Sequence, residues 1–104
     1  MVRGEVFRLR VPRATRGSEQ RGCYAIVVQA DELLALSTVL VSPTSTAAPA
    51  RSFRPTVDIH GTPTRVLVEQ TTAISPDRLG ESVGRLDSSE LRALDSALAL
   101  VFGL

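Results

Sequence analysis

The chain has 104 residues with no lysine, no tryptophan, one cysteine and one histidine. A lone Cys23 excludes an internal disulfide, and one cysteine with one histidine does not make a zinc ligand set. The longest apolar runs, such as Ala25–Val28, are too short to span a bilayer, and the N-terminus has no apolar leader. We therefore expect a cytoplasmic protein with no membrane contact and no metal or cofactor.

Aromatic residues are also scarce, at 4% of the chain. This argues against a broad platform on which single-stranded RNA bases stack, although Tyr24 alone could stack one base. The length fits a single domain over residues 1–104, with a core small enough that burial against a partner is useful.

Every basic side chain is an arginine, and the chain carries 12 of them against 11 acidic residues. Residues 1–65 hold nine arginines and five acidic residues, whereas residues 66–104 hold three and six. The guanidinium group suits phosphate oxygens, so the positive N-terminal part is compatible with a polyanionic partner. By charge alone, a solvated arginine-rich surface is the simpler interpretation.

Short β-rich segments separated by turn signals make up most of the sequence. Pro12 and Pro43 end two of them, and His60–Pro63 is typical of a hairpin turn. The expected strands are Glu5–Val11, Cys23–Gln29, Ser37–Ser42, Phe53–Ile59, Thr64–Val68 and Glu81–Leu86.

Helical signals are confined to a short turn and the C-terminus. Ser75 followed by Pro76 predicts a turn that reaches Leu79 and ends at Gly80. Asp87 and Glu90 have the spacing of a capping box, and Gly103 is a stop signal. Between them, four apolar residues recur at helical spacing: Leu91, Leu94, Leu98 and Val101. The pattern predicts a mainly β (α+β) fold, a small antiparallel sheet or barrel with one amphipathic C-terminal helix.

Four segments, taken in order, resemble the MazF/PemK toxin family. Each is weak alone, but their order and spacing over nearly the whole chain are specific. They are Arg3–Val6; Gly17–Gln20 with its continuation to Asp31; Pro43–Thr46; and Val68–Leu86 leading into the terminal helix.

The resemblance implies an SH3-like antiparallel barrel with a C-terminal helix, MazF/CcdB-like, and a homodimer. It also implies the toxin component of a type II toxin–antitoxin system, inhibited by an acidic segment of a MazE-like antitoxin. The implied activity is a metal-independent, sequence-selective endoribonuclease that inhibits translation and growth. It cleaves single-stranded RNA by 2′-hydroxyl attack, which leaves a 2′,3′-cyclic phosphate and a 5′-hydroxyl.

The resemblance also places the catalytic candidates. The family has an arginine followed by proline before its second strand, where this chain has Cys23 and Tyr24. Arg21 is the substitute we expect to stabilise the phosphorane, and an ordinary solvated loop arginine is an equal alternative. The active threonine of the family falls on Ser45, with Thr46 beside it, although small polar residues are also typical of a plain turn.

The RNA-binding candidates lie in the same two segments. They are Arg16, Ser18, Glu19, Gln20 and Thr44. Glu19 and Gln20 would hydrogen-bond RNA or orient the arginine, and Arg16 is a weaker substitute for Arg21.

Three other residues have stronger structural than functional interpretations. Cys23 lies in an apolar context typical of a buried thiol, and Tyr24 is typical of a strand core. His60 is placed in a turn, although histidine is the side chain type that exchanges protons near neutral pH.

The departure at Cys23–Tyr24 leaves other functions open. One is a catalytically weakened RNA- or protein-binding module on the same fold, similar to a gyrase-poisoning toxin. Another is a plain oligomerisation domain.

Overall fold

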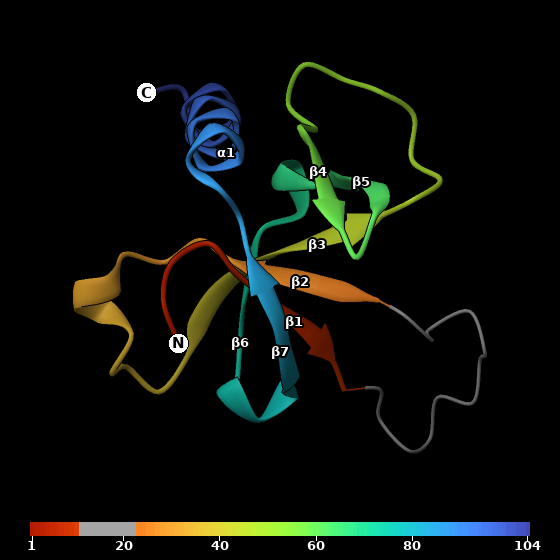
Figure 1. The fold of residues 1–104 in the computed structure, drawn as a ribbon. Coiled ribbons are helices and arrows are strands. Elements are labelled where there is room, and N and C mark those ends of the chain that lie inside the picture. The colour runs from red at the N-terminus through yellow and green to blue at the C-terminus, as the bar shows by residue number, and fades with distance from the viewer. Residues whose placement is uncertain (11–22) are drawn as a thin grey trace.

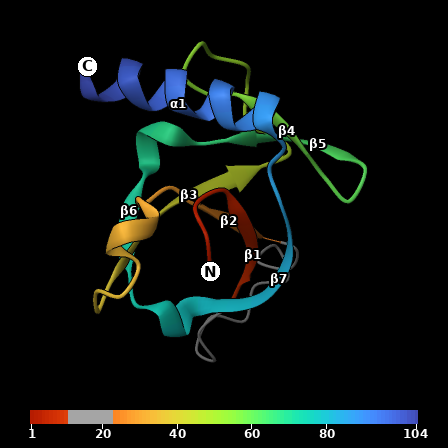
Figure 2. The same cartoon turned by 60° about the vertical axis from the view of Figure 1, so that its left-hand side comes forward.

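The computed structural model describes residues 1–10 and 23–104, which form one curled antiparallel sheet and one C-terminal helix (Figure 1). The sheet order is β4-β5-β3-β2-β1-β7, and β6 pairs with β3. The strands are β1 (Glu5–Leu9), β2 (Tyr24–Val27), β3 (Val39–Ser45), β4 (Thr56–Ile59), β5 (Thr62–Val66), β6 (Thr72–Ile74) and β7 (Leu79–Arg85). Helix α1 (Ser88–Phe102) lies across one side of the curled sheet (Figure 2), so the predicted small antiparallel sheet or barrel with a C-terminal helix is confirmed.

Strand β3 organises the sheet because it changes partner along its length. One edge pairs with β2, while the other pairs first with β6, up to Val41 and Thr72, and then with β5 from Thr44 and Val66. The prediction that Pro43 ends this strand was wrong. Pro43 pairs with Ala25 in β2, and on the other edge its carbonyl accepts the Leu67 amide at 2.8 Å. Proline has no N–H to donate to a neighbouring strand, and on that edge Pro43 lies between the last residue paired with β6 and the first paired with β5.

The β4–β5 hairpin is confirmed, but its turn is shorter than predicted. Only His60 and Gly61 form the turn, with φ values of 53° and 80°. Positive φ at both central residues is what a two-residue type I′ hairpin turn requires. Pro63 belongs to β5, where its pairing partner is Asp58 in β4 and no β3 partner has yet joined. Before β4, the Arg54 amide donates to the Arg51 carbonyl and forms a turn. The strand therefore starts at Thr56 and not at Phe53 as predicted.

The turn before β7 is confirmed, although Gly80 does not end it. The Ser75 hydroxyl accepts the Asp77 amide at 3.3 Å, and β7 starts at once with Leu79 paired to Leu9. Gly80 is inside that strand, and a Cβ there would lie 2.8 Å from the Arg8 carbonyl oxygen. Glycine is therefore needed for close approach of β1 and β7.

The capping box that opens α1 is confirmed in both directions. The Asp87 carboxylate accepts the Glu90 amide at 2.7 Å, and the Glu90 carboxylate accepts the Asp87 amide at 3.0 Å. Gly103 closes the helix with a φ of 72°. No helix within residues 1–10 and 23–104 is long and apolar enough to cross a membrane.

Among the described residues, the core consists of two apolar clusters on opposite faces of the sheet. One contains Ile26, Val66 and Leu94 and lies under α1, and the other contains Val27, Val39 and Val41. This division follows the two-residue alternation of side chains in β2 and β3. It also leaves the C-terminal end of β3, beyond both clusters, to polar residues.

Candidate functional site

Ser45 and Arg65 are direct pairing partners where β5 joins the end of β3. Paired residues in neighbouring strands have their side chains on the same face of the sheet. The Ser45 hydroxyl oxygen accepts the amides of Ala47 and Ala48 at 3.1 and 3.0 Å. A hydroxyl has one hydrogen and two lone pairs, so these two bonds hold the oxygen in place without using its hydrogen.

The Arg65 guanidinium is attached to the same turn. Its Nε donates to the Ala48 carbonyl at 3.0 Å, and its Nη1 donates to the Thr56 hydroxyl at 2.6 Å. Ala48 is therefore bonded to Ser45 through its N–H and to Arg65 through its carbonyl. We call these two side chains, with Thr56 and the Ala47–Ala48 turn, the Ser45–Arg65 site.

Thr44 belongs to the opposite face of β3, and its hydroxyl is already engaged. It donates to the Tyr24 carbonyl at 2.9 Å. The Tyr24 side chain is half-buried against the core cluster under α1, in keeping with a structural role. Arg8 lies over its ring at 5.2 Å, and the exposed His60 ring is 6.3 Å from it, centroid to centroid.

An ion pair secures the loop between β3 and β4, residues 46–55, which follows Ser45 in the chain. Arg54 donates to one Glu69 carboxylate oxygen through Nε at 3.1 Å and Nη2 at 2.6 Å, and its Nη1 donates to the Pro49 carbonyl at 3.3 Å. The hydrogen bonds from Arg54 lower the pKa of Glu69, and the same pair raises the pKa of Arg54. This loop is therefore tied to the fold independently of Arg65.

Elsewhere, the pKa of Glu5 is lowered as well. Burial would raise it, but hydrogen bonds from the Ser82 hydroxyl and the Val2 amide outweigh that effect. Among the residues that the structure describes, no group of three histidine, cysteine or carboxylate side chains is arranged to hold a metal ion.

The sequence-predicted site residues divide into two sets. Ser45 and Thr44 end β3, and Thr46 follows as an exposed residue. The remaining candidates lie outside the described residues: Arg16, Ser18, Glu19, Gln20 and Arg21. The described residues on either side of that segment meet at one end of β1 and β2, where the Leu9 amide donates to the Cys23 carbonyl at 3.0 Å.

Sequence reasoning overlooked Arg65. The available signal was a charged residue between Thr64 and Val66 in a strand, which indicates only that its side chain faces away from the core. Its pairing with Ser45 depends on the register between β3 and β5, which no local pattern contains.

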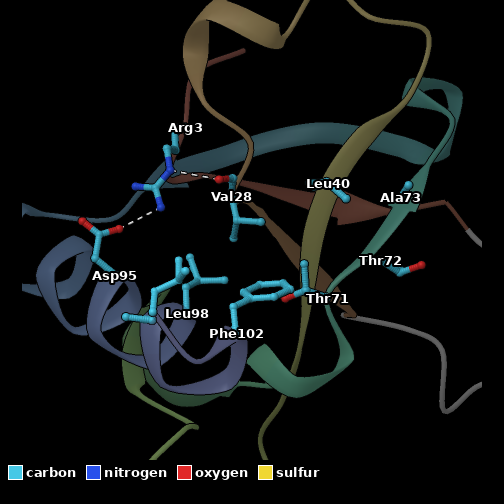
Figure 3. Close-up of a pocket in the computed structure, with 11 residues that line it drawn as sticks. Arg3, Val28, Leu40, Thr71, Thr72, Ala73, Asp95, Leu98 and Phe102 are labelled. Atoms are coloured by element: carbon cyan, nitrogen blue, oxygen red, sulfur yellow. Dashed lines mark hydrogen bonds and ion pairs between the residues drawn. The ribbon is translucent and has the colours of Figure 1, made fainter.

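A second region of the surface is hollow and apolar (Figure 3). A pocket of about 640 Å³ lies between α1, β3 and β6, with Leu40, Leu98 and Phe102 among its lining residues. Arg3 and Asp95 form an ion pair of 2.7 Å at its side, and the Arg3 Nε also donates to the Val28 carbonyl at 2.9 Å. Large apolar side chains are exposed nearby at the end of the chain: Leu100, Val101, Phe102 and Leu104.

Comparison with known proteins identifies the family. The family model described as PemK-like, MazF-like toxin of type II toxin-antitoxin system matches residues 2–102. The chain belongs to this family. A candidate toxin of Mycobacterium tuberculosis is 38% identical over 105 residues, covering 100% of this chain and 99% of that protein.

Solved structures share the fold at low sequence identity. An endoribonuclease from a mycobacterial species, in complex with its cognate antitoxin, has a TM-score of 0.82 at 18% identity, covering 100% of this chain and 96% of that one. The Mycobacterium tuberculosis toxin MazF-mt6 has a TM-score of 0.78 at 19% identity, with 96% and 97% coverage. The predicted family and fold of this MazF-like toxin are thus confirmed.

Proposed function

We propose that this MazF-like toxin is a metal-independent endoribonuclease that cleaves single-stranded RNA at selected sequences and so inhibits translation and growth. The observation that carries the proposal is the Ser45 hydroxyl, which two backbone amides hold in place through bonds that leave its hydrogen for another acceptor, such as a phosphate oxygen. Family membership and structural neighbours described as endoribonucleases support the same activity.

The proposed reaction uses the 2′-hydroxyl of the RNA as the nucleophile. The bond between phosphorus and the 2′-oxygen forms, and the bond to the 5′-oxygen breaks, which leaves a 2′,3′-cyclic phosphate and a 5′-hydroxyl. A base removes the 2′ proton, an acid protonates the leaving oxygen, and hydrogen-bond donors stabilise the charge on the phosphorane.

The roles assigned to this chain follow from its two polar segments. Ser45 and Thr46 donate to phosphate oxygens, and Arg21 supplies positive charge. The RNA strand is held by Arg16, Ser18, Glu19, Gln20 and Thr44. Ser45 is a better hydroxyl donor than Thr44, because the Thr44 hydrogen is engaged with the Tyr24 carbonyl.

We further propose that the toxin is a cytoplasmic homodimer regulated by a MazE-like antitoxin. The exposed apolar end of α1 and the adjoining pocket provide a surface that a second copy would bury. An acidic antitoxin segment would compete with RNA for the arginine-rich surface. A structural neighbour that is an endoribonuclease bound to its antitoxin supports this assignment.

A digest of total RNA tests the activity. Purified toxin should cut RNA in the presence of excess EDTA, and end-group analysis should find 2′,3′-cyclic phosphates and 5′-hydroxyls. Cleavage that stops with EDTA and returns with a divalent metal would contradict the mechanism. No cleavage of any RNA would favour the weakened binding module that the Cys23–Tyr24 departure leaves open.

A further inference from the structure

Arg65 is a half-buried residue whose guanidinium is hydrogen-bonded to Ala48, the same residue that the Ser45 hydroxyl binds. We infer that Arg65 is a catalytic residue that donates to the scissile phosphate together with Ser45. This role rests on the proposed RNA cleavage and adds a group that the sequence motifs do not include.

Shared attachment to one residue brings the two groups together. Ser45 binds the N–H of Ala48 and Arg65 binds its carbonyl, both at 3.0 Å, and the two side chains share one face of paired strands. A peptide segment held at both ends leaves little freedom for either side chain. The hydroxyl and the guanidinium are therefore oriented before RNA arrives, which lowers the cost of binding a developing charge.

The charge of Arg65 distinguishes it from the described arginines that form ion pairs. Arg3, Arg8 and Arg54 form ion pairs with Asp95, Glu81 and Glu69. Within the described part of the chain, the hydrogen bonds of Arg65 go to two neutral oxygens instead, those of Ala48 and Thr56.

A guanidinium has five N–H donors, and these two bonds use two of them. An arginine bound to neutral acceptors keeps both positive charge and donors for an anion. Bidentate binding of phosphate oxygens is the interaction that its geometry favours.

A purely structural role would give a different result in a matched comparison. Arg54 ties the same loop through the Pro49 carbonyl and Glu69 but has no contact with the Ala47–Ala48 turn in the described hydrogen bonds. If Arg65 only holds the loop, removing Arg54 should cost as much cleavage as removing Arg65.

The experiment measures single-turnover cleavage of an RNA oligonucleotide that contains a cut site found in the total-RNA digest. We expect Arg65→Ala to lower the rate constant on the order of 10²-fold, as loss of a transition-state donor does elsewhere, and Arg54→Ala to stay within a few-fold of wild type. Added methylguanidinium should restore part of the Arg65→Ala rate and leave Arg54→Ala unchanged. Affinity for the same sequence with 2′-O-methyl groups, which cannot be cleaved, should fall less than the rate.

Arg65→Gln provides a second variant in case Arg65→Ala does not fold by circular dichroism. It keeps an N–H donor near Ala48 but has no charge, and we expect a similar loss of rate. Equal cleavage by the folded Arg65 variant and wild type, or an equal loss in Arg54→Ala, would overturn the role of Arg65 alone. A wild-type protein that cuts no RNA would overturn the proposed function and this role with it.

Discussion

The Ser45–Arg65 site and the apolar end of α1 are built in opposite ways. At the first, hydrogen bonds fix each side chain: Ser45 accepts two amides, and Arg65 donates to two oxygens. At the second, Phe102 and Leu104 are 60% and 95% exposed beside a pocket lined mainly by carbon. Orientation matters for the first and buried area for the second, so changes at the two regions should alter different measurements.

The largest expected effect is on RNA cleavage, from a change in the Ser45–Arg65 site. Ser45→Ala should lower the rate of RNA cleavage on the order of 10²-fold, because it removes a donor to the phosphorane. The same change also removes the two hydrogen bonds that the Ala47 and Ala48 amides donate to Ser45, each worth about 1 kcal/mol of folding stability. Ser75→Ala is the matched control, since Ser75 caps the Asp77 amide in another turn.

Single-turnover rates and thermal melts of both serine variants separate chemistry from folding. Both should melt slightly earlier than wild type, and only Ser45→Ala should cut slowly. Equal rates for the two variants would mean that Ser45 is a turn residue and nothing more.

The next effect is on assembly. Phe102→Asp introduces a charge among the exposed apolar side chains at the end of α1, where a dimer interface would exclude water. We expect the dimer to dissociate at micromolar concentration while circular dichroism stays native. Light scattering coupled to size-exclusion chromatography measures the mass.

Leu36→Asp is the control for this prediction, because Leu36 is similarly exposed, at 56%, but does not line the pocket. A Phe102→Asp protein with the mass of wild type would place the interface elsewhere.

The smallest effect concerns the ion pair between Arg54 and Glu69, which secures the loop between β3 and β4. Folding lowers the pKa of Glu69 below its ordinary value of 4.5 through hydrogen bonds from Arg54, so the pair stabilises the fold above that value. The stabilisation should be lost as the pH falls through the lowered pKa. Glu69→Gln should therefore melt slightly earlier than wild type at pH 7, and the difference should shrink in acid.

The direction in which the melting-temperature difference between Glu69→Gln and wild type changes with pH tests this prediction. A difference that grows in acid would contradict the lowered pKa. Cleavage by Glu69→Gln at neutral pH should remain close to wild type, because the loop is also attached through Arg65.

Local patterns predicted several elements well because their causes lie within a few residues. The capping box of Asp87 and Glu90, the Ser75 turn and the β4–β5 hairpin each depend on neighbours in the chain. Pro43 was wrongly predicted to end its strand. Whether β3 can contain a proline depends on which strand lies beside that position, and this is set by where β6 ends and β5 begins.

Of the two side chains in the Ser45–Arg65 site, only Ser45 was a candidate from the sequence. Ser45 stands out by its place in a family-like segment, whereas Arg65 carries no motif. The roles of all these candidates, Ser45 included, stay predictions, and Arg21 and its neighbours also lie outside the described residues.

The amino-acid order alone was enough for the family, the β-rich class and the capped terminal helix, because composition, short-range spacing and motif order encode them. Only the folded chain shows the strand register, the partner change of β3 and the pairing of Arg65 with Ser45. Pairing between distant strands is selected by burying both faces of the sheet at once, and no short segment contains that information.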